Sequence, residues 1–484
     1  MSAMSPAGGV GFLRRRWHAR SGYREVLALA GPLVLSTGSM TVQQFVDRMF
    51  LSWHSPEALA AALPAGTISF TVMCFFIGTA SYVNTFVAQY HGSGQPERIA
   101  ASVWQAIYVA LLSALFILPF ALLAEPLFRL AGHDGAVQEA ECVYFRILIL
   151  GGGASVLSAA VSSFFTGIGK TATVMWVNIG AAALNGILDY AMVLGNFGLP
   201  KMGIAGAGWA TVIAQSCGAL MFLGLFLLGP LRARYNVWHN WRVDWPLLGR
   251  LLRFGAPSGV QFMLDILAWS VFIMLVGRLG VAELGATTLA FQVNSIVFMP
   301  MIGFAIATST LVGQRLGENR ADLATTATWS AFHITFGYMA FVAALYVLTP
   351  NLFLAPFGAK ADPAEFAPLR DMAVILLRFV ALYSLLDGAN LIFSAALKGA
   401  GDTVFVMFLS SSLGLVLMVL PTWLVCRDEN GSIWAAWWSL TAFVMVLAVC
   451  FLLRFLQGKW KSMRVVEEAP AAADEVALAE VETA

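Results

Sequence analysis

Twelve long apolar segments constrain this chain more than any other feature. A helix needs about 20 apolar residues to cross the hydrocarbon of a membrane. Breaks rich in Gly, Pro and charge separate the segments, and strand-like alternation is missing, so a helical bundle is expected rather than a barrel. The predicted spans are 27–50, 61–87, 101–124, 141–165, 172–194, 204–229, 248–277, 285–312, 325–349, 372–396, 404–426 and 433–456.

The composition agrees with this interpretation. Hydrophobic residues make up 59% of the 484 and charged residues 11%, whereas soluble proteins carry about 25% charged residues. The predicted fold class is therefore an all-α integral membrane protein with twelve transmembrane helices, and its main partner is the lipid bilayer. The net charge of +1 gives no reason to expect a nucleic-acid partner.

The distribution of Lys and Arg indicates the orientation. With the N-terminus in the cytoplasm, 19 Lys and Arg residues, including Lys398, fall on the cytoplasmic side and 6 fall outside. Positive charge is enriched in cytoplasmic loops, so both termini are predicted to be cytoplasmic. Residues 1–24 then form a basic cytoplasmic segment, and residues 459–484 form an acidic cytoplasmic tail that we expect to be disordered.

The two halves of the chain repeat each other. Each half begins on the same side and holds six spans, so the halves should be related by a pseudo-twofold axis along the membrane normal. We predict a first lobe at 25–230, a cytoplasmic linker at 231–246 and a second lobe at 247–458. Equivalent residues are 225 apart in the first spans and 232 apart further on: Pro32 and Pro257, Gln89 and Gln314, Gly167 and Gly399.

Two acids lie deep within predicted spans of the second lobe. Asp265 is in the seventh span, and Asp387 is in the tenth, one helical turn after Tyr383. A charge at mid-membrane costs about 2.5–3.5 kcal/mol, so such acids are functional by default. Tyr383 and Asp387 share a helical face and can contribute oxygens to a bound cation. The alternative is a structural hydrogen bond between Asp387 and Tyr383 or Asn390.

The first lobe carries a second set of polar residues. Asp47 and Asp189 are predicted at similar depths in the first and fifth spans, and Asn185 precedes Asp189 by one turn. Oxygen ligands without Cys or His suit a proton or a hard cation rather than a transition metal. Two alternatives remain open: Asp47 pairs with the adjacent Arg48, or Asp189 reaches the outer surface.

Several motifs together resemble the multidrug and toxic compound extrusion (MATE) family over residues 23–458. They are GPLVL, FVDRMFLSW, VAQYHGSG, LNGILDY, PSGVQFMLD, ATTLAFQVNSIVFMPMIGFAIATSTLVGQRLGE and LYSLLDGANLIFSAALKGAGDT. The resemblance implies a V-shaped bundle of two six-helix lobes. It also implies export of organic cations coupled to inward flow of Na+ or H+.

The resemblance also assigns residues to two sites. Asp47, Asn185 and Asp189 match the family's first-lobe cation or proton site, and Thr211 is expected to complete it. The second-lobe cation site corresponds to Asp265, Tyr383 and Asp387, and the two acids are also candidate substrate ligands. Na+ is expected at one of these two sites if it is the coupling ion. The seventh-span acid is commonly Glu in the family and is Asp265 here, which leaves the choice of ion open.

The leading hypothesis is therefore a secondary active exporter that works by alternating access. We expect a monomer in the bacterial inner membrane, with small organic cations as substrates, no enzymatic activity and no cofactor besides the coupling ion. The second hypothesis is a flippase for a lipid-linked oligosaccharide, which would require basic residues in its cavity. Apart from residues at the span ends, only Arg48, Arg146 and Arg378 lie within the predicted spans, against four acids. A non-transporting scaffold would leave those acids without a role.

Overall fold

The computed structural model describes residues 14–131, 135–358, 363–428 and 431–467. Helices account for the regular structure of these ranges, which contain no strand. Twelve of the helical segments are long and apolar enough to cross a membrane, which confirms the predicted class and number of spans.

The first six spans begin at Tyr23 and end at Leu228. The second span, Pro56–Gly92, is divided after Ser81 into two helices. The third span, Pro96–Arg129, continues through a 3-10 turn into a short helix. The elements are α2 (Tyr23–His54), α3 (Pro56–Ser81), α4 (Val83–Gly92), α5 (Pro96–Ile117), η1 (Leu118–Leu123), α6 (Ala124–Ala131), α7 (Gly135–Gly167), α8 (Thr171–Met192) and α9 (Ile204–Leu228).

The last six spans begin at Trp245. Asp244 caps the first of them by accepting a hydrogen bond from Leu247 N at 3.0 Å, with Pro246 in the first turn, as expected at a helix N-terminus. The elements are α10 (Trp245–Val276), α11 (Val281–Gly317), α12 (Ala321–Leu348), α13 (Pro350–Gly358), α14 (Pro363–Ala400), α15 (Thr403–Leu413), η2 (Gly414–Val419), α16 (Leu420–Arg427), α17 (Ile433–Leu456) and η3 (Lys459–Ser462).

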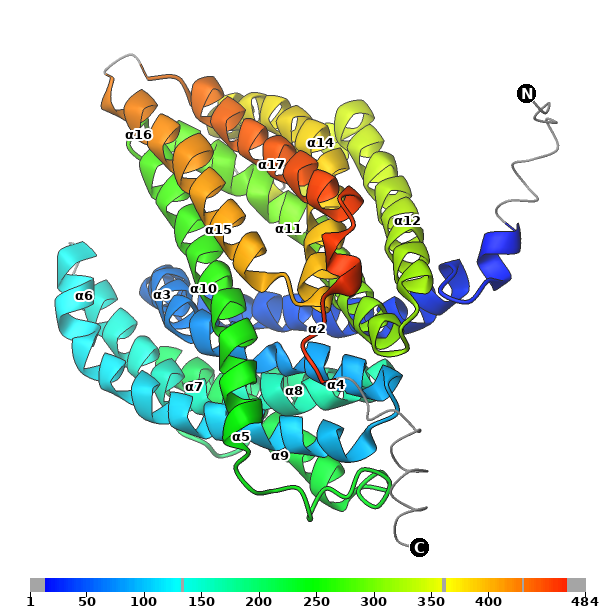
Figure 1. Cartoon of the computed structure of the whole chain (residues 1–484). Helices are drawn as coiled ribbons and strands as arrows, with labels where there is room; N and C mark the ends of the chain where they lie inside the picture. Colours follow the sequence, from blue (N-terminus) through cyan, green and yellow to red (C-terminus); the bar gives the residue numbers. More distant parts are fainter. Residues whose placement is uncertain (1–13, 132–134, 359–362, 429–430, 468–484) are drawn as a thin grey trace, which may run out of the picture.

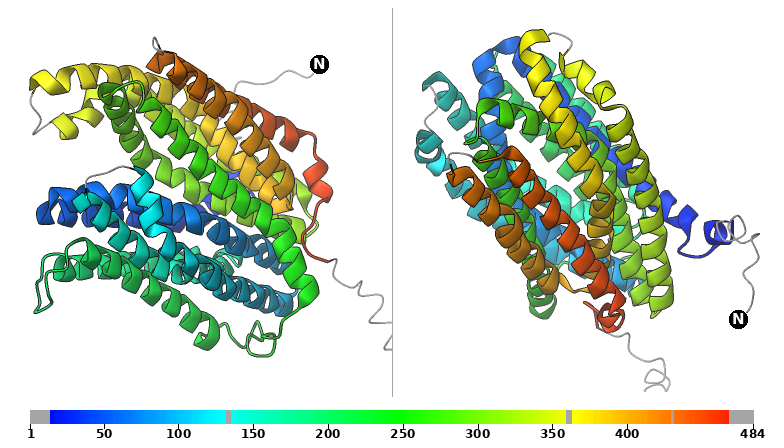
Figure 2. Two further views of the ribbon diagram at one scale, coloured as in Figure 1. Left: turned by 90° about the vertical axis from the view of Figure 1, so that its left-hand side faces the viewer. Right: turned by 90° about the horizontal axis from the view of Figure 1, so that it is seen from above.

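These helices form two lobes, the first from α2 to α9 and the second from α10 to α17 (Figure 1). In the first lobe α7 packs against α3, α5 and α9; in the second, α14 packs against α11, α12 and α17. The lobes approach one another at the end of the bundle where residues 229–244 connect α9 to α10, and they diverge away from it (Figure 2, left). We call this the linker end. The exact domain boundaries stay predictions.

Reciprocal hydrogen bonds join the lobes at the linker end. Gln89 of α4 donates through Nε2 to the carbonyl of Gly399 at 3.0 Å, and Gln314 of α11 donates to the carbonyl of Gly167 at 2.8 Å. Both carbonyls lie in the last turn of a helix, where no intrahelical donor is available. Because the two glutamines are pseudo-symmetry mates and so are the two glycines, one contact is the counterpart of the other.

Close backbone approach completes this junction. A Cβ atom on Gly92 would lie 1.9 Å from Gln314 O, and one on Gly317 would lie 2.1 Å from Gln89 O. Glycine is therefore required at both helix ends. Together with the Gln89 and Gln314 hydrogen bonds, these contacts form what we call the linker-end seal.

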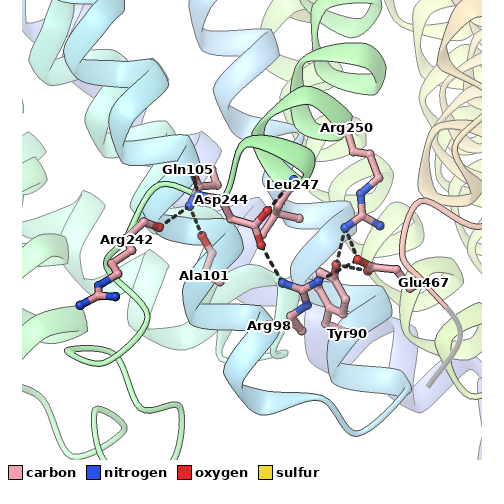
Figure 3. Close-up of polar contacts among 9 residues, drawn as sticks. All are labelled: Tyr90, Arg98, Ala101, Gln105, Arg242, Asp244, Leu247, Arg250 and Glu467. Carbon is pink, nitrogen blue, oxygen red and sulfur yellow. Dashed lines mark hydrogen bonds and ion pairs between the residues drawn. The ribbon is translucent and has the colours of Figure 1, made fainter. Parts of the chain in front are cut away.

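The C-terminal segment 459–467 packs against the same end of the molecule (Figure 3). Val465 N donates to Gln89 Oε1 at 2.9 Å, and Glu467 accepts from Tyr90 Oη at 2.7 Å. Glu467 also pairs with Arg98 at 2.8 Å and with Arg250. The expected disorder of 459–484 therefore does not hold for 459–467, because these contacts fix the segment. Residues 468–484 lie outside the described ranges.

Candidate cation sites in the two lobes

The first-lobe site gathers residues from three helices. Asp47 lies on α2, Asn185 and Asp189 lie one turn apart on α8, and Thr211 lies on α9. The packing of α8 against both α2 and α9 brings them together. Asn185 and Asp189 are fully buried, and Asp47 is half-buried. The four residues that the sequence suggested thus form one cluster.

Hydrogen bonds connect the members of this cluster. With the Asn185 amide oriented to satisfy its neighbours, its nitrogen donates to Asp47 Oδ1 at 2.7 Å and its oxygen accepts from Thr211 N at 3.3 Å. The carboxyl groups of Asp47 and Asp189 lie close enough to interact directly. Two carboxylates that share a site repel each other, so a proton or a cation between them is favoured.

Neither alternative for the first-lobe acids describes this structure. Arg48 is exposed, and no ion pair joins it to Asp47, although both residues are described. Asp189 has no exposed surface and does not reach outward. The two acids therefore face the interior of the first lobe.

Two oxygens of this cluster have no hydrogen-bond partner among the described residues. They are Asp189 Oδ1 and Thr211 Oγ1. Buried polar atoms normally have partners, and an orphan in a native structure points to an absent ion, water or proton. Their chemistry fits a hard cation or a proton.

The structure adds two residues that the sequence argument missed. Tyr144 of α7 is buried and interacts electrostatically with both Asp47 and Asp189. The side-chain amide of Gln43 lies 3.2 Å from that of Asn185. Gln43 is one turn before Asp47, so helical spacing could have identified it. Nothing local to Tyr144 distinguishes it from a packing aromatic.

In the second lobe, Asp265 is held by neutral donors. Gln261, one turn earlier on α10, donates to its Oδ2 at 3.1 Å, and Ser410 of α15 donates to its Oδ1 at 2.8 Å. The packing of α10 against α15 explains the second contact. Both carboxyl oxygens therefore have partners within the lobe.

Lys398 also belongs to this group. Its Nζ lies 3.4 Å from Gln261 Oε1, and its charge interacts with that of Asp265. The backbone of Lys398 lies at a helix end, and its half-buried side chain turns toward α10. A long side chain at a helix end can fold back along its own lobe in this way. The cytoplasmic placement of Lys398 stays a prediction.

Asp387 and Tyr383 occupy a different environment. Asp387 Oδ1 accepts from Asn390 Nδ2 at 3.1 Å, which is one of the structural bonds considered above. The Tyr383 ring is 1% exposed and interacts electrostatically with Asp387, but its hydroxyl has no partner among the described residues. Of the two structural bonds considered for Asp387, the one to Asn390 is therefore formed and the one to Tyr383 is not.

Asp265 is bonded to Gln261 and Ser410, and no described hydrogen bond links it to Tyr383 or Asp387. A single second-lobe cation site made of these three residues stays a prediction.

Two six-helix lobes, with carboxyl groups enclosed between their helices and one end sealed, define a two-lobed membrane transporter. Residues 32–191 and 257–424 match the MatE family, one stretch in each lobe. The chain belongs to this family, whose members are transporters and not enzymes.

Curated relatives match most of the chain. A probable multidrug resistance protein NorM from Brucella suis is 27% identical over 436 residues. The aligned region covers 89% of this chain and 92% of the Brucella protein. The multidrug resistance protein NorM of Burkholderia vietnamiensis is 27% identical over 430 residues, covering 88% and 92%.

Solved structures share the fold. One, described as the outward-facing conformation of a multidrug resistance MATE family transporter, aligns with a TM-score of 0.82 at 20% identity and covers 96% of this chain and 100% of its own. A MOP superfamily transporter from Pyrococcus furiosus, described as having a binding pocket of reverse polarity, gives the same values. At this level of identity the likeness concerns the fold alone.

Proposed function

We propose that this protein is a secondary active exporter of drugs and other organic cations, driven by inward flow of Na+ or H+. The observation that carries the proposal is the buried Asp47–Asp189 pair with its unpartnered oxygen and its neighbour Thr211. Intramembrane acids mark ion and substrate pathways by default. The relatives named as multidrug resistance proteins support drugs as the substrate class.

The proposed orientation places the linker end in the cytoplasm. The excess of Lys and Arg in the corresponding loops and in 229–254 supports this orientation in a bacterial inner membrane. With the linker-end seal closed, the conformation described here is then outward-facing. Alternating access requires the lobes to separate at the linker end and close at the other.

The first-lobe pair is the proposed coupling site. The coupling ion enters from outside and is either a Na+ ion that binds Asp47, Asn185 and Asp189 or a proton that binds one of the two carboxyl groups. One elementary charge that moves inward supplies about 2.3 kcal/mol per 100 mV. This energy corresponds to roughly fifty-fold accumulation of substrate without ATP. Transport by a monomer is sufficient, because each chain contains both lobes.

Reconstituted transport tests this proposal. Proteoliposomes with an imposed Na+ or pH gradient should drive movement of a cationic dye, and Asp189→Asn should abolish the gradient-driven part. The matched control is Asp371→Asn, at a carboxylate whose side chain is 69% exposed. Dye movement that ignores both gradients would refute the proposal. Gradient-independent movement of a lipid-linked oligosaccharide would favour the flippase instead.

A further inference from the structure

Lys398 connects the second-lobe acid to the linker-end seal. It lies in the last turn of α14, and its side chain turns back toward Gln261 and Asp265 of α10. Its own carbonyl accepts a hydrogen bond from Tyr82 Oη of the first lobe at 2.8 Å. The next residue, Gly399, accepts the inter-lobe bond from Gln89. One residue thus takes part in both a buried charge cluster and the contact between lobes.

The charge balance of the cluster explains why a lysine is placed there. Asp265 receives hydrogen bonds from Gln261 and Ser410, but both donors are neutral. A buried carboxylate is costly unless a positive charge compensates it. The Lys398 ammonium supplies that charge on a flexible four-carbon stem, so it can also move away. The Lys398 ammonium therefore acts on the charge of Asp265 from its contact with Gln261, and no ion pair joins these two described residues.

The first lobe has no equivalent arrangement. The offset of 232 that relates Gly399 to Gly167 relates Lys398 to Thr166, which is neutral. Thr166 bonds to the carbonyl of Ser162 within its own helix. The ammonium is thus an addition to one lobe, and the repeated fold does not require it.

We propose that Lys398 is a tethered cation that balances the charge of Asp265 from its contact with Gln261 while the linker end is sealed and that an incoming coupling cation must displace it. The proposal rests on the function proposed above. Displacement frees the Lys398 side chain, which lies one residue before the acceptor of Gln89. Binding of a cation at Asp265 thereby weakens the seal, and reformation of the seal expels the cation. Lys398 acts as a positioning residue, and it also sets which cations can compete for Asp265.

The competing explanation is that Lys398 has a purely structural role in the contact between α14 and α10. Variants that change the charge or the length of its side chain distinguish the two explanations. Lys398→Met keeps the apolar stem and removes the charge, whereas Lys398→Arg keeps the charge. In the full-length protein in nanodiscs, unfolding temperature is measured against Na+ concentration and against pH. Hydrogen exchange at 82–92 and 397–402 reports the seal in the same samples.

A tethered competitor makes a specific prediction. In Lys398→Met, the half-saturating concentration of the cation that drives efflux should fall at least tenfold. The same cation should slow hydrogen exchange at the linker-end seal of this variant, whereas it should speed this exchange in the wild type. Lys398→Arg should keep the wild-type concentration. Adding Asp265→Asn to Lys398→Met should remove the new binding and also restore folding if the single variant folds poorly.

Two results would overturn different claims. An unchanged half-saturating concentration in Lys398→Met, with gradient-driven efflux intact, would refute the role of Lys398 and leave the exporter in place. If Lys398→Met and Lys398→Arg both lose stability, and the dependence of unfolding temperature on cation concentration stays unchanged, the role of Lys398 is purely structural. Wild-type efflux that ignores both gradients would refute the exporter itself, and this is measured independently of the binding curves.

Discussion

The two lobes share one backbone arrangement but carry different polar chemistry. Asp47 in the first lobe corresponds, at the offset of 225, to Phe272, and Asp265 in the second corresponds to Met40. The first-lobe acids interact with one another, whereas the charge of Asp265 interacts with that of Lys398. The pseudo-twofold repeat therefore preserves the fold without preserving the sites.

The linker-end seal shows the opposite behaviour. Gln89 and Gln314 bond to equivalent carbonyls, and Gly92 and Gly317 meet equivalent backbone atoms. Symmetry is kept at the contact between the lobes and is lost at the two proposed ion sites. We infer that the duplicated fold supplies the motion and that each lobe acquired its own binding chemistry.

The strongest test of this comparison is to neutralise one acid in each lobe. Asp189→Asn should lower gradient-driven efflux at least about 100-fold, equivalent to about 2.7 kcal/mol or more, because it removes one of the two paired first-lobe acids. Asp387→Asn should lower efflux about tenfold or less, because Asp387 already has a structural partner in Asn390. Initial rates of dye movement in proteoliposomes measure both, with Asp371→Asn as the control. The reverse ranking would move the coupling role to the second lobe.

The second test separates the two halves of the seal. Gln314→Leu removes one inter-lobe bond, whereas Gln89→Leu removes that bond's counterpart and also the acceptor for Val465 N. A buried group that loses its partner costs about 1–3 kcal/mol, so Gln89→Leu should destabilise the seal more. Hydrogen exchange at 397–402 and 465–467 measures the difference. Equal effects would show that the C-terminal segment contributes nothing to the seal.

The third test uses two buried tyrosine hydroxyls. Tyr82 donates across the lobes to Lys398 O, whereas the hydroxyl of Tyr383 has no described partner. Tyr82→Phe should lower stability by about 1 kcal/mol. Tyr383→Phe should leave stability unchanged or slightly higher, because it removes an unsatisfied buried group. Unfolding temperatures in nanodiscs check both, and a clear loss in Tyr383→Phe would indicate a partner such as a bound ion.

Much of this architecture could be predicted from the sequence. Span number and the repeat follow from hydropathy and from fixed offsets such as that of Gln89 and Gln314, because membrane crossing constrains every segment separately. The first-lobe cluster was also predictable, since Asn185 and Asp189 share a helical face and Asp47 has a similar depth.

The second lobe shows where sequence reasoning stops. Asp265 and Asp387 are both intramembrane acids, yet they have separate hydrogen-bond partners. The packing of α10 against α15 supplies one of the partners of Asp265. Lys398 was assigned to the cytoplasm because its backbone lies at a helix end, and only the direction of its side chain reveals its contact with Gln261. Contacts between distant helices and the direction of long side chains are tertiary properties that local spacing does not encode.

The smallest expected effect concerns pH at the C-terminal segment. Partial burial would raise the pKa of Glu467, but hydrogen bonds from Arg250 and Tyr90 outweigh it and lower this pKa from 4.5 to about 2. A lowered pKa means that the stabilisation is present above about pH 4.5 and is lost as pH falls toward 2. The contacts of 459–467 should therefore be unchanged between pH 8 and pH 5, while any pH response of transport arises within the lobes.

Hydrogen exchange at 463–467 between pH 8 and pH 5, corrected for the intrinsic rate, measures this directly. Glu467→Gln mimics the protonated side chain and should raise exchange there at every pH, and Glu318→Gln offers a comparison at another ion-paired carboxylate of the same end. A wild-type response to mild acid at 463–467 would mean that the segment senses pH itself. In that case the asymmetry between the lobes would not be the sole source of pH dependence, and the C-terminal segment would have to be included in the coupling mechanism.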